Sequence, residues 1–155
     1  MTTSGINEQL MKKLILLIML SLPVIVACDD DDGMKVHPNN AVLEFIDSRY
    51  PGSRLRSSEY EKNGLLEVEI SHEGKIKDVY FDSQSKWVYT SWDVRRSDLP
   101  QVVSSAIDEA YHGYRIDGID FIERDAISYY SIELERGGDN EIVVNVTPEG
   151  EILNR

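Results

Sequence analysis

The sequence predicts an α+β protein built as a tandem repeat, in which one helix and about four antiparallel strands occur twice. Three observations predict this architecture: a repeated motif, an amphipathic segment at the start of each copy, and alternating apolar and polar residues after it. In the motif, residues 46–55 align with residues 107–116, and Ile, Asp, Tyr, Gly and Arg recur in register. The expected copies are residues 38–96 and 97–155.

The first copy is expected to open with a helix. Its apolar residues recur at spacings of three and four, which places them on one helical face: Val42, Phe45, Ile46 and Tyr50. Asn39 and Asn40 are residue types that cap helix starts, and Gly52 suits the left-handed turn that ends a helix. This helix should cover one face of the sheet.

The second copy repeats this pattern. Ser97 or Asp98 can cap the helix, and Pro100 fits its first turn. The apolar side is formed by Val103, Ala106, Ile107 and Ala110. Gly113 follows the helix as Gly52 follows the first one.

Alternating segments predict the strands, at residues 66–71, 78–82, 129–134 and 142–146. A period of two with one polar face is typical of an antiparallel sheet that is buried on one side and solvated on the other. The helices should pack on the apolar side. The solvated side should then carry Tyr80, Tyr129, Glu67, Glu69 and Glu133.

Residues 1–27 are expected to be a lipoprotein signal peptide whose true start is Met11. Lys12 and Lys13 precede the apolar run 14–27, which is shorter than the roughly 20 residues of a membrane-spanning helix. The run ends in Ile-Val-Ala-Cys28, which resembles the lipobox of bacterial lipoproteins, where the cysteine carries the lipid. We therefore expect a lipid on Cys28 to attach the chain to a membrane.

An acidic run follows the cysteine directly: Asp29, Asp30, Asp31 and Asp32. It falls in an expected tether, residues 28–37, and resembles the surface-export signal of lipoproteins in some gut-dwelling Gram-negative bacteria. The expected location is the outer membrane, with the domain exposed at the cell surface. The alternative is a periplasm-facing lipoprotein, whose aspartates repel one another and keep the tether extended.

Charge and motifs exclude several function classes. The chain has 16 basic and 28 acidic residues; without residues 1–27, which hold two lysines and one glutamate, the net charge is 14 − 27 = −13. That balance argues against nucleic-acid binding, which depends on Lys and Arg neutralising phosphates. The sequence contains no recognised catalytic, nucleotide-binding or metal-binding motif, so we expect no cofactor and no obligate metal.

Aromatic residues crowd the segment 86–92. Strict alternation would direct Trp87 and Tyr89 to one face of the sheet and Trp92 to the other. Two interpretations stay open: these rings fill the core between the copies, or they form a contact surface. The candidate partner-binding residues are Tyr80, Trp87, Tyr89, Trp92, Tyr129, Glu67, Glu69 and Glu133.

The chain from about Pro38 to Arg155 resembles the PepSY-like, β-lactamase-inhibitor-like family of bacterial lipoproteins. The resemblance rests on Leu99-Pro100, on Tyr111-x-Gly113-x-Arg115, and on Pro148-Glu149-Gly150. His112 departs from the motif, in which proline is usual. The resemblance implies a fold like that of the β-lactamase inhibitor protein, and a peptidase as one class of partner.

These observations lead to one expected function and two alternatives. We expect a non-enzymatic binding module of the cell envelope that engages or inhibits a protein partner, such as a peptidase, through the open face of its sheet. A surface binder of glycan or of another small ligand, using the same aromatic residues, is the alternative. An enzyme that relies on paired carboxylates comes third.

Overall fold

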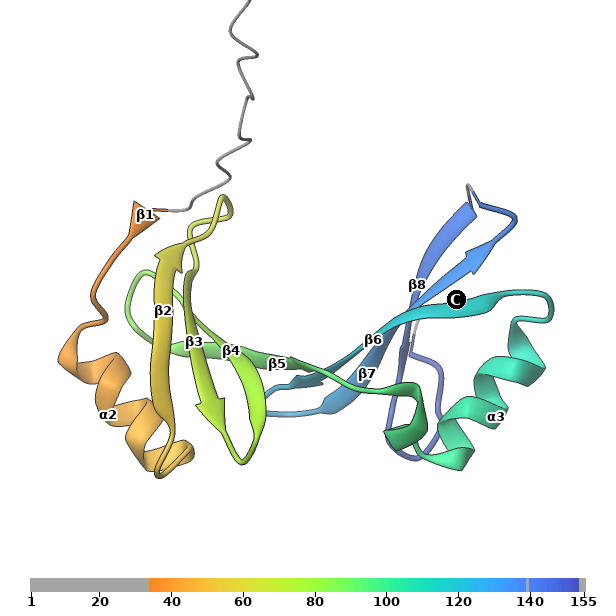
Figure 1. Cartoon of the computed structure of the whole chain (residues 1–155), viewed down its shortest axis with the longest axis horizontal. Helices are drawn as coiled ribbons and strands as arrows, with labels where there is room; N and C mark the ends of the chain where they lie inside the picture. The colour runs from red at the N-terminus through yellow and green to blue at the C-terminus, as the bar shows by residue number, and fades with distance from the viewer. Residues whose placement is uncertain (1–33, 139, 154–155) are drawn as a thin grey trace, which may run out of the picture. The chain divides into compact units, whose positions relative to one another are not determined.

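The computed structural model describes residues 34–138 and 140–153. The predicted signal peptide, Cys28 and the acidic run at residues 29–32 therefore lie outside the described residues. The described chain forms one antiparallel sheet of eight strands, ordered as they occur in the sequence, together with two α-helices (Figure 1). Within the described ranges, no helix is long and apolar enough to cross a membrane.

The helices and strands fall into two halves. The first contains β1 (Met34–Lys35), α2 (Asn40–Arg49), β2 (Arg54–Tyr60), β3 (Leu66–His72), β4 (Lys75–Phe81) and β5 (Trp87–Asp93). The second contains the 3₁₀ turn η1 (Arg96–Asp98), α3 (Gln101–Ala110), β6 (Arg115–Glu123), β7 (Ser128–Arg136) and β8 (Asn140–Val146). Four strands follow α2, as expected, but three follow α3. In place of a further strand, Ile152 makes a single bridge to Val146.

The two helices begin differently. Asn39 caps α2 as predicted, because its side-chain oxygen accepts a 3.1 Å hydrogen bond from the backbone N–H of Val42. The prediction that Ser97 or Asp98 caps α3 is wrong, since both residues belong to η1. Pro100 occupies the cap position instead and makes no side-chain cap bond. Its ring holds φ at −56°, close to the helical value, so the chain can enter the helix directly.

Each helix shares a core with the strands of its own half. The first cluster joins Val42, Ile46 and Tyr50 of α2 to Leu66, Val68 and Ile70 of β3 and to Val79 and Phe81 of β4. The second joins Leu99, Val103 and Ile107 to Ile119 of β6, Ile132 and Leu134 of β7, and Val144 and Val146 of β8. The alternating apolar residues of the strands therefore line the buried side, as the period of two predicts.

The pairing register divides the sheet into two faces. Paired residues on neighbouring strands point to the same side, and Val68 pairs with Val79, which pairs with Thr90. Continued through β8, this register puts both clusters on one side, which we call the helix-side face. The open face carries the alternate residues: Ser57, Glu59, Glu67, Glu69, Asp78, Tyr80, Tyr89, Ser91, Asp93, Asp120, Ile122, Tyr129, Ser131, Glu133 and Asn145.

A β-bulge corrects the expected direction of Trp87. The β4–β5 register shifts, so that Phe81 pairs with Trp87 while Tyr80 pairs with Tyr89. The bulge adds one residue to β5, and Trp87 therefore points to the helix-side face rather than to the face of Tyr89. Trp92 also points to the helix-side face, because its partner is Phe121. The prediction that the two tryptophans point to opposite faces is wrong.

Candidate functional site

Neither helix of the described chain packs on the open face, because both belong to the core clusters on the other side of the sheet. None of the open-face residues named above is buried: each is exposed or of intermediate exposure. Tyrosines and carboxylates dominate this surface. Of these, tyrosine is a residue type that is enriched at the centres of protein interfaces.

The centre of the first half of this face is a hydrogen-bonded cluster. Glu67, Tyr80 and Tyr89 are successive Cα partners on β3, β4 and β5. The Tyr80 hydroxyl donates a 2.8 Å hydrogen bond to the Glu67 carboxylate. The Tyr80 and Tyr89 rings stack with centroids 4.3 Å apart, and the guanidinium of Arg124 lies 5.2 Å from the Tyr89 centroid. The contacts hold both rings in fixed positions.

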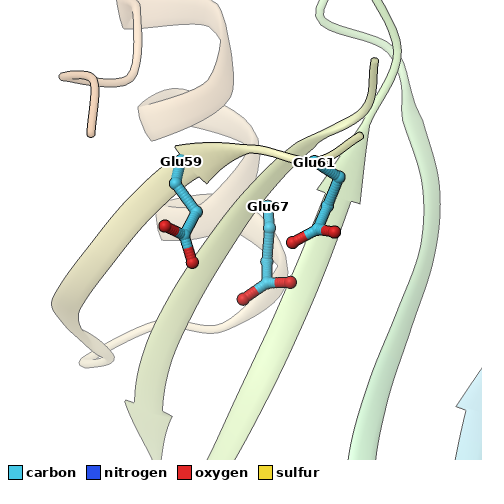
Figure 2. Close-up of side chains that lie close together, drawn as sticks. All are labelled: Glu59, Glu61 and Glu67. Carbon is cyan, nitrogen blue, oxygen red and sulfur yellow. The ribbon is translucent and has the colours of Figure 1, made fainter. Parts of the chain in front are cut away.

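Two further carboxylates, those of Glu59 and Glu61, lie close to Glu67. Figure 2 shows Glu59 on β2, Glu61 just after β2 and Glu67 on β3. One carboxylate oxygen of each lies within 4.8 Å of the others. Burial raises the pKa of Glu67 to about 7; the hydrogen bond from Tyr80 opposes this rise, and the charges of Asp78 and Glu61 add to it. Glu67 therefore changes its charge near neutral pH.

A second acidic group lies along the middle of the open face. Burial raises the pKa of Asp78 to about 6, and the charges of Glu69, Asp93 and Asp120 add to the rise. Burial also raises the pKa of Asp120, with further contributions from the charge of Asp93 and a hydrogen bond to it. Arg56 compensates part of this charge through a 2.6 Å ion pair with Glu69. The remaining charge makes the open face acidic.

The register continues this surface into the second half. Asp78 pairs with Ser91, Ser91 with Ile122, and Ile122 with Tyr129. Tyr129 therefore lies in one cross-strand row with Asp78. This row joins the part of the open face on β4 and β5 to the part on β6 and β7.

Glu133 reaches the open face beside a glycine. It pairs with Gly118 on β6, and a Cβ on that glycine would lie 3.0 Å from the Glu133 carboxylate oxygen. A side chain at position 118 would therefore displace the Glu133 carboxylate. Gly118 leaves room for the acid to lie across the neighbouring strand.

The structure thus divides the predicted site residues into two sets. The open face brings together Glu67, Glu69, Tyr80, Tyr89, Tyr129 and Glu133. Trp87 instead packs against the first core cluster, stacks with Phe45 at 5.6 Å, and donates a 2.9 Å hydrogen bond to Thr90. Trp92 lies on the helix-side face against Phe121, with centroids 4.8 Å apart.

Sequence reasoning missed several members of the open face. Asp93 and Asp120 are Cα partners on β5 and β6, and Arg124 follows β6. A signal existed for Asp93, because it continues the alternation from Tyr89 through Ser91. Asp120 and Arg124 lie on the open face because β6 pairs with β5, and that pairing joins the two halves.

An unbroken antiparallel sheet with one open face and two helices packed on the opposite side defines the class of fold. Residues 64–154 match the family model described as "Putative beta-lactamase-inhibitor-like, PepSY-like". The chain belongs to this PepSY-like family. The family is described as inhibitor-like, and the resemblance predicted from the sequence is confirmed.

Solved structures from three Bacteroides species share the fold. A BLIP-like protein from Bacteroides fragilis NCTC 9343 is 22% identical, with a TM-score of 0.66, and the match covers 81% of this chain and 89% of that one. A DUF2874 family protein from Bacteroides ovatus ATCC 8483 is 21% identical, with a TM-score of 0.67 and coverages of 77% and 86%. A structure described as "putative periplasmic proteins" from Bacteroides eggerthii DSM 20697 is 15% identical, with a TM-score of 0.60 and coverages of 77% and 88%. No curated protein matches the chain.

Proposed function

We propose that this protein is a non-enzymatic binding module of the cell envelope that engages a protein partner through its open face. The observation that supports the proposal most strongly is the cluster of Glu67, Tyr80 and Tyr89, whose rings are stacked and hydrogen-bonded yet only partly buried. Preorganised tyrosines lose little conformational entropy on binding. The class of partner that we propose is a peptidase, and the proposed consequence of binding is inhibition of that peptidase.

The charge of the open face specifies the partner further. Glu59, Glu67, Asp78, Asp93 and Asp120 lie on neighbouring strands of this face. Their mutual repulsion is relieved when a basic segment lies across them, so the complementary surface carries Lys or Arg. A stable complex of this kind buries about 800 Å² on each partner. The sheet is wide enough to place tyrosines at the centre and acids around them.

The location that we propose is the outer membrane, with the chain attached through lipid on Cys28. The lipobox supports the attachment, and the B. eggerthii protein of the same fold, which is described as periplasmic, agrees with an envelope address. The acidic run at residues 29–32 supports exposure at the cell surface.

We also propose that the two halves are copies of one unit. The repeated sequence motif places Ile46 in α2 and Ile107 in α3 at equivalent positions. Both side chains are buried in the core of their own half. The C-cap residues Tyr50 and Tyr111 also match, and each donates its backbone N–H to the isoleucine four residues earlier.

An envelope pull-down with matched variants tests the function. The full chain with a C-terminal affinity tag is recovered from envelope extract, beside Tyr89→Ala and a Glu67→Gln/Asp78→Asn double variant. The control is Val102→Ser, which changes an exposed residue on α3. We expect one partner to be retained by wild type and control, to be lost with the open-face variants, and to dissociate at high salt. Retention by every variant would contradict the proposal.

A further inference from the structure

The helix-side face holds a cavity of about 670 Å³ that the open-face function does not use. Its lining includes the rings of Trp92, Phe121 and Tyr130, the cations Lys75 and Arg95, and the acids Glu73, Asp93 and Asp98. This volume lies within the range of small-molecule sites, roughly 300–1,000 Å³. Because Trp92 and Phe121 belong to neither core cluster, their rings are available to the cavity.

Three aromatic rings form a continuous row in this cavity. Phe121 is the Cα partner of both Trp92 and Tyr130. Its ring centroid lies 4.8 Å from that of Trp92 and 5.0 Å from that of Tyr130. All three side chains are of intermediate exposure, so the row offers an apolar surface to a flat ligand.

The ammonium groups of two lysines lie close to the ring of Trp92. The ammonium of Lys75 lies 5.5 Å from the Trp92 centroid and that of Lys77 lies 4.4 Å from it. Lys77 is only 8% exposed, and its ammonium also lies 4.8 Å from the Tyr50 ring. In the part of the chain that the structure describes, no carboxylate lies within 4.0 Å of either ammonium. Burial of the Lys77 ammonium without a carboxylate at that distance lowers the stability of the fold.

The three acids that line the cavity either have other partners or extend into solvent. Asp98 forms a 2.8 Å ion pair with Arg95, and Asp93 hydrogen-bonds with Asp120 on the open face. Glu73 extends into solvent, with 81% of its side chain exposed. The charges of Glu123 and Glu73 still favour the charged form of Lys77, so the two lysines are partly neutralised without a close ion pair. The site combines two ammonium groups with aromatic ring faces.

We propose that this cavity binds a small molecule that carries a carboxylate on a flat apolar body. The carboxylate would accept a hydrogen bond from Lys75, and the apolar body would lie on the row of rings. Lys77 lies beside Trp92 but outside the cavity lining, and it would add positive charge there. An ammonium paired with a carboxylate at this depth forms a charge-assisted hydrogen bond, which exceeds a neutral one in strength. The site lies on the face opposite the proposed partner surface, so either proposal can fail alone.

The two tryptophans of the chain provide the readout. We would follow their indole N–H signals by ¹⁵N NMR on the full chain in detergent micelles. The probe is phenylacetate, and its neutral control of matched shape is phenylacetamide. We expect phenylacetate to shift the Trp92 signal saturably and to bind about tenfold more tightly than the amide. The Trp87 indole, which donates to Thr90, should stay unchanged.

Three variants test which lysine is responsible for phenylacetate binding. Lys77→Met removes the buried ammonium, and Lys75→Gln removes the exposed one and keeps the test valid if the first variant does not fold. Lys86→Gln removes an exposed lysine outside the cavity lining. We expect Lys75→Gln to weaken phenylacetate binding about tenfold, Lys77→Met to weaken it by a smaller factor, and Lys86→Gln to leave it unchanged. Equal binding of acid and amide, equal shifts of both indoles, no shift at Trp92, or unaltered binding by Lys75→Gln would overturn the proposal.

Discussion

The Tyr80 hydroxyl donates a hydrogen bond of 2.8 Å to the Glu67 carboxylate, and the two residues face each other across β3 and β4. Burial still raises the pKa of Glu67 to about 7, because the hydrogen bond offsets only part of the desolvation. The same pair thus orders a tyrosine of the open face and keeps a titrating acid beside it. The effects of this pair on stability and on the Glu67 pKa can be measured without knowing any partner.

The raised carboxyl pKa values predict that the fold gains stability as the pH falls. Glu67 has a folded-state pKa of about 7 against an ordinary value of 4.5, so the folded protein binds its proton more tightly than the unfolded chain. The free energy of unfolding contributed by this group is lowest above pH 7 and rises as the pH falls toward 4.5. After solvent screening we expect a gain of about 1 kcal/mol. Urea unfolding across this pH range measures it.

Two variants check that Glu67 is responsible. Glu67→Gln removes the titrating group and should flatten this part of the pH dependence. Tyr80→Phe removes the hydrogen bond that lowers the Glu67 pKa, so that pKa should rise further, as followed by ¹³C NMR of the carboxyl group. An identical pH profile in wild type and Glu67→Gln would show that other groups dominate.

The burial of the core residues predicts that their truncation strongly destabilises the fold. Ile46 is 6% exposed in the first cluster and Ile107 is 3% exposed in the second. Truncation of either to alanine should lower the free energy of unfolding by roughly 2–5 kcal/mol. Glu133→Gln, at an exposed position of the open face, should change it by no more than about 0.5 kcal/mol. Denaturant unfolding compares the three, and a Glu133→Gln loss as large as that of Ile107→Ala would invalidate the face assignment.

These two faces show how far the sequence could predict the structure. A period of two identified the buried side of β3, β4, β7 and β8, because alternation is a direct result of strand geometry. It failed at Trp87, where the bulge in β5 adds one residue that no local pattern announces. The residues Glu67 and Tyr80 could be assigned to one face, but their hydrogen bond depends on the exact pairing of two strands.

The cavity on the helix-side face illustrates a second limit. Lys75 and Lys77 look like ordinary solvated charges in the sequence, since they alternate with Ile76 and Asp78. Their place beside Trp92 is set by the pairing of β4 with β5, and that of Phe121 by the pairing of β5 with β6. Contacts between strands from different halves cannot be read from either half alone.

The proposed lipid attachment predicts a clear result for one substitution. Cys28 is the only cysteine of the chain and follows the apolar run directly. Cys28→Ala should therefore abolish metabolic labelling with palmitate and release the protein from the membrane fraction. Cys28→Ser serves as a second variant that also lacks the thiol. Palmitate labelling that persists in both would contradict the lipoprotein assignment.

The acidic run predicts where the domain resides. Replacing Asp29, Asp30, Asp31 and Asp32 with alanine should hide the protein from protease added to intact cells, if these residues direct export to the surface. Replacement with glutamate keeps the charge and should preserve accessibility. If alanine leaves accessibility unchanged, the run acts as a spacer and not as an export signal.

Site-specific photocrosslinking in intact cells tests the central claim, binding of a protein partner by the open face, most directly. A photoreactive phenylalanine analogue would replace Tyr89 or Tyr129 on that face, and Val102 on α3 as the matched exposed control. We expect irradiation to give one adduct of the same mass from both open-face positions and none from position 102. An adduct from position 102 alone, or the same adduct from all three positions, would contradict the account.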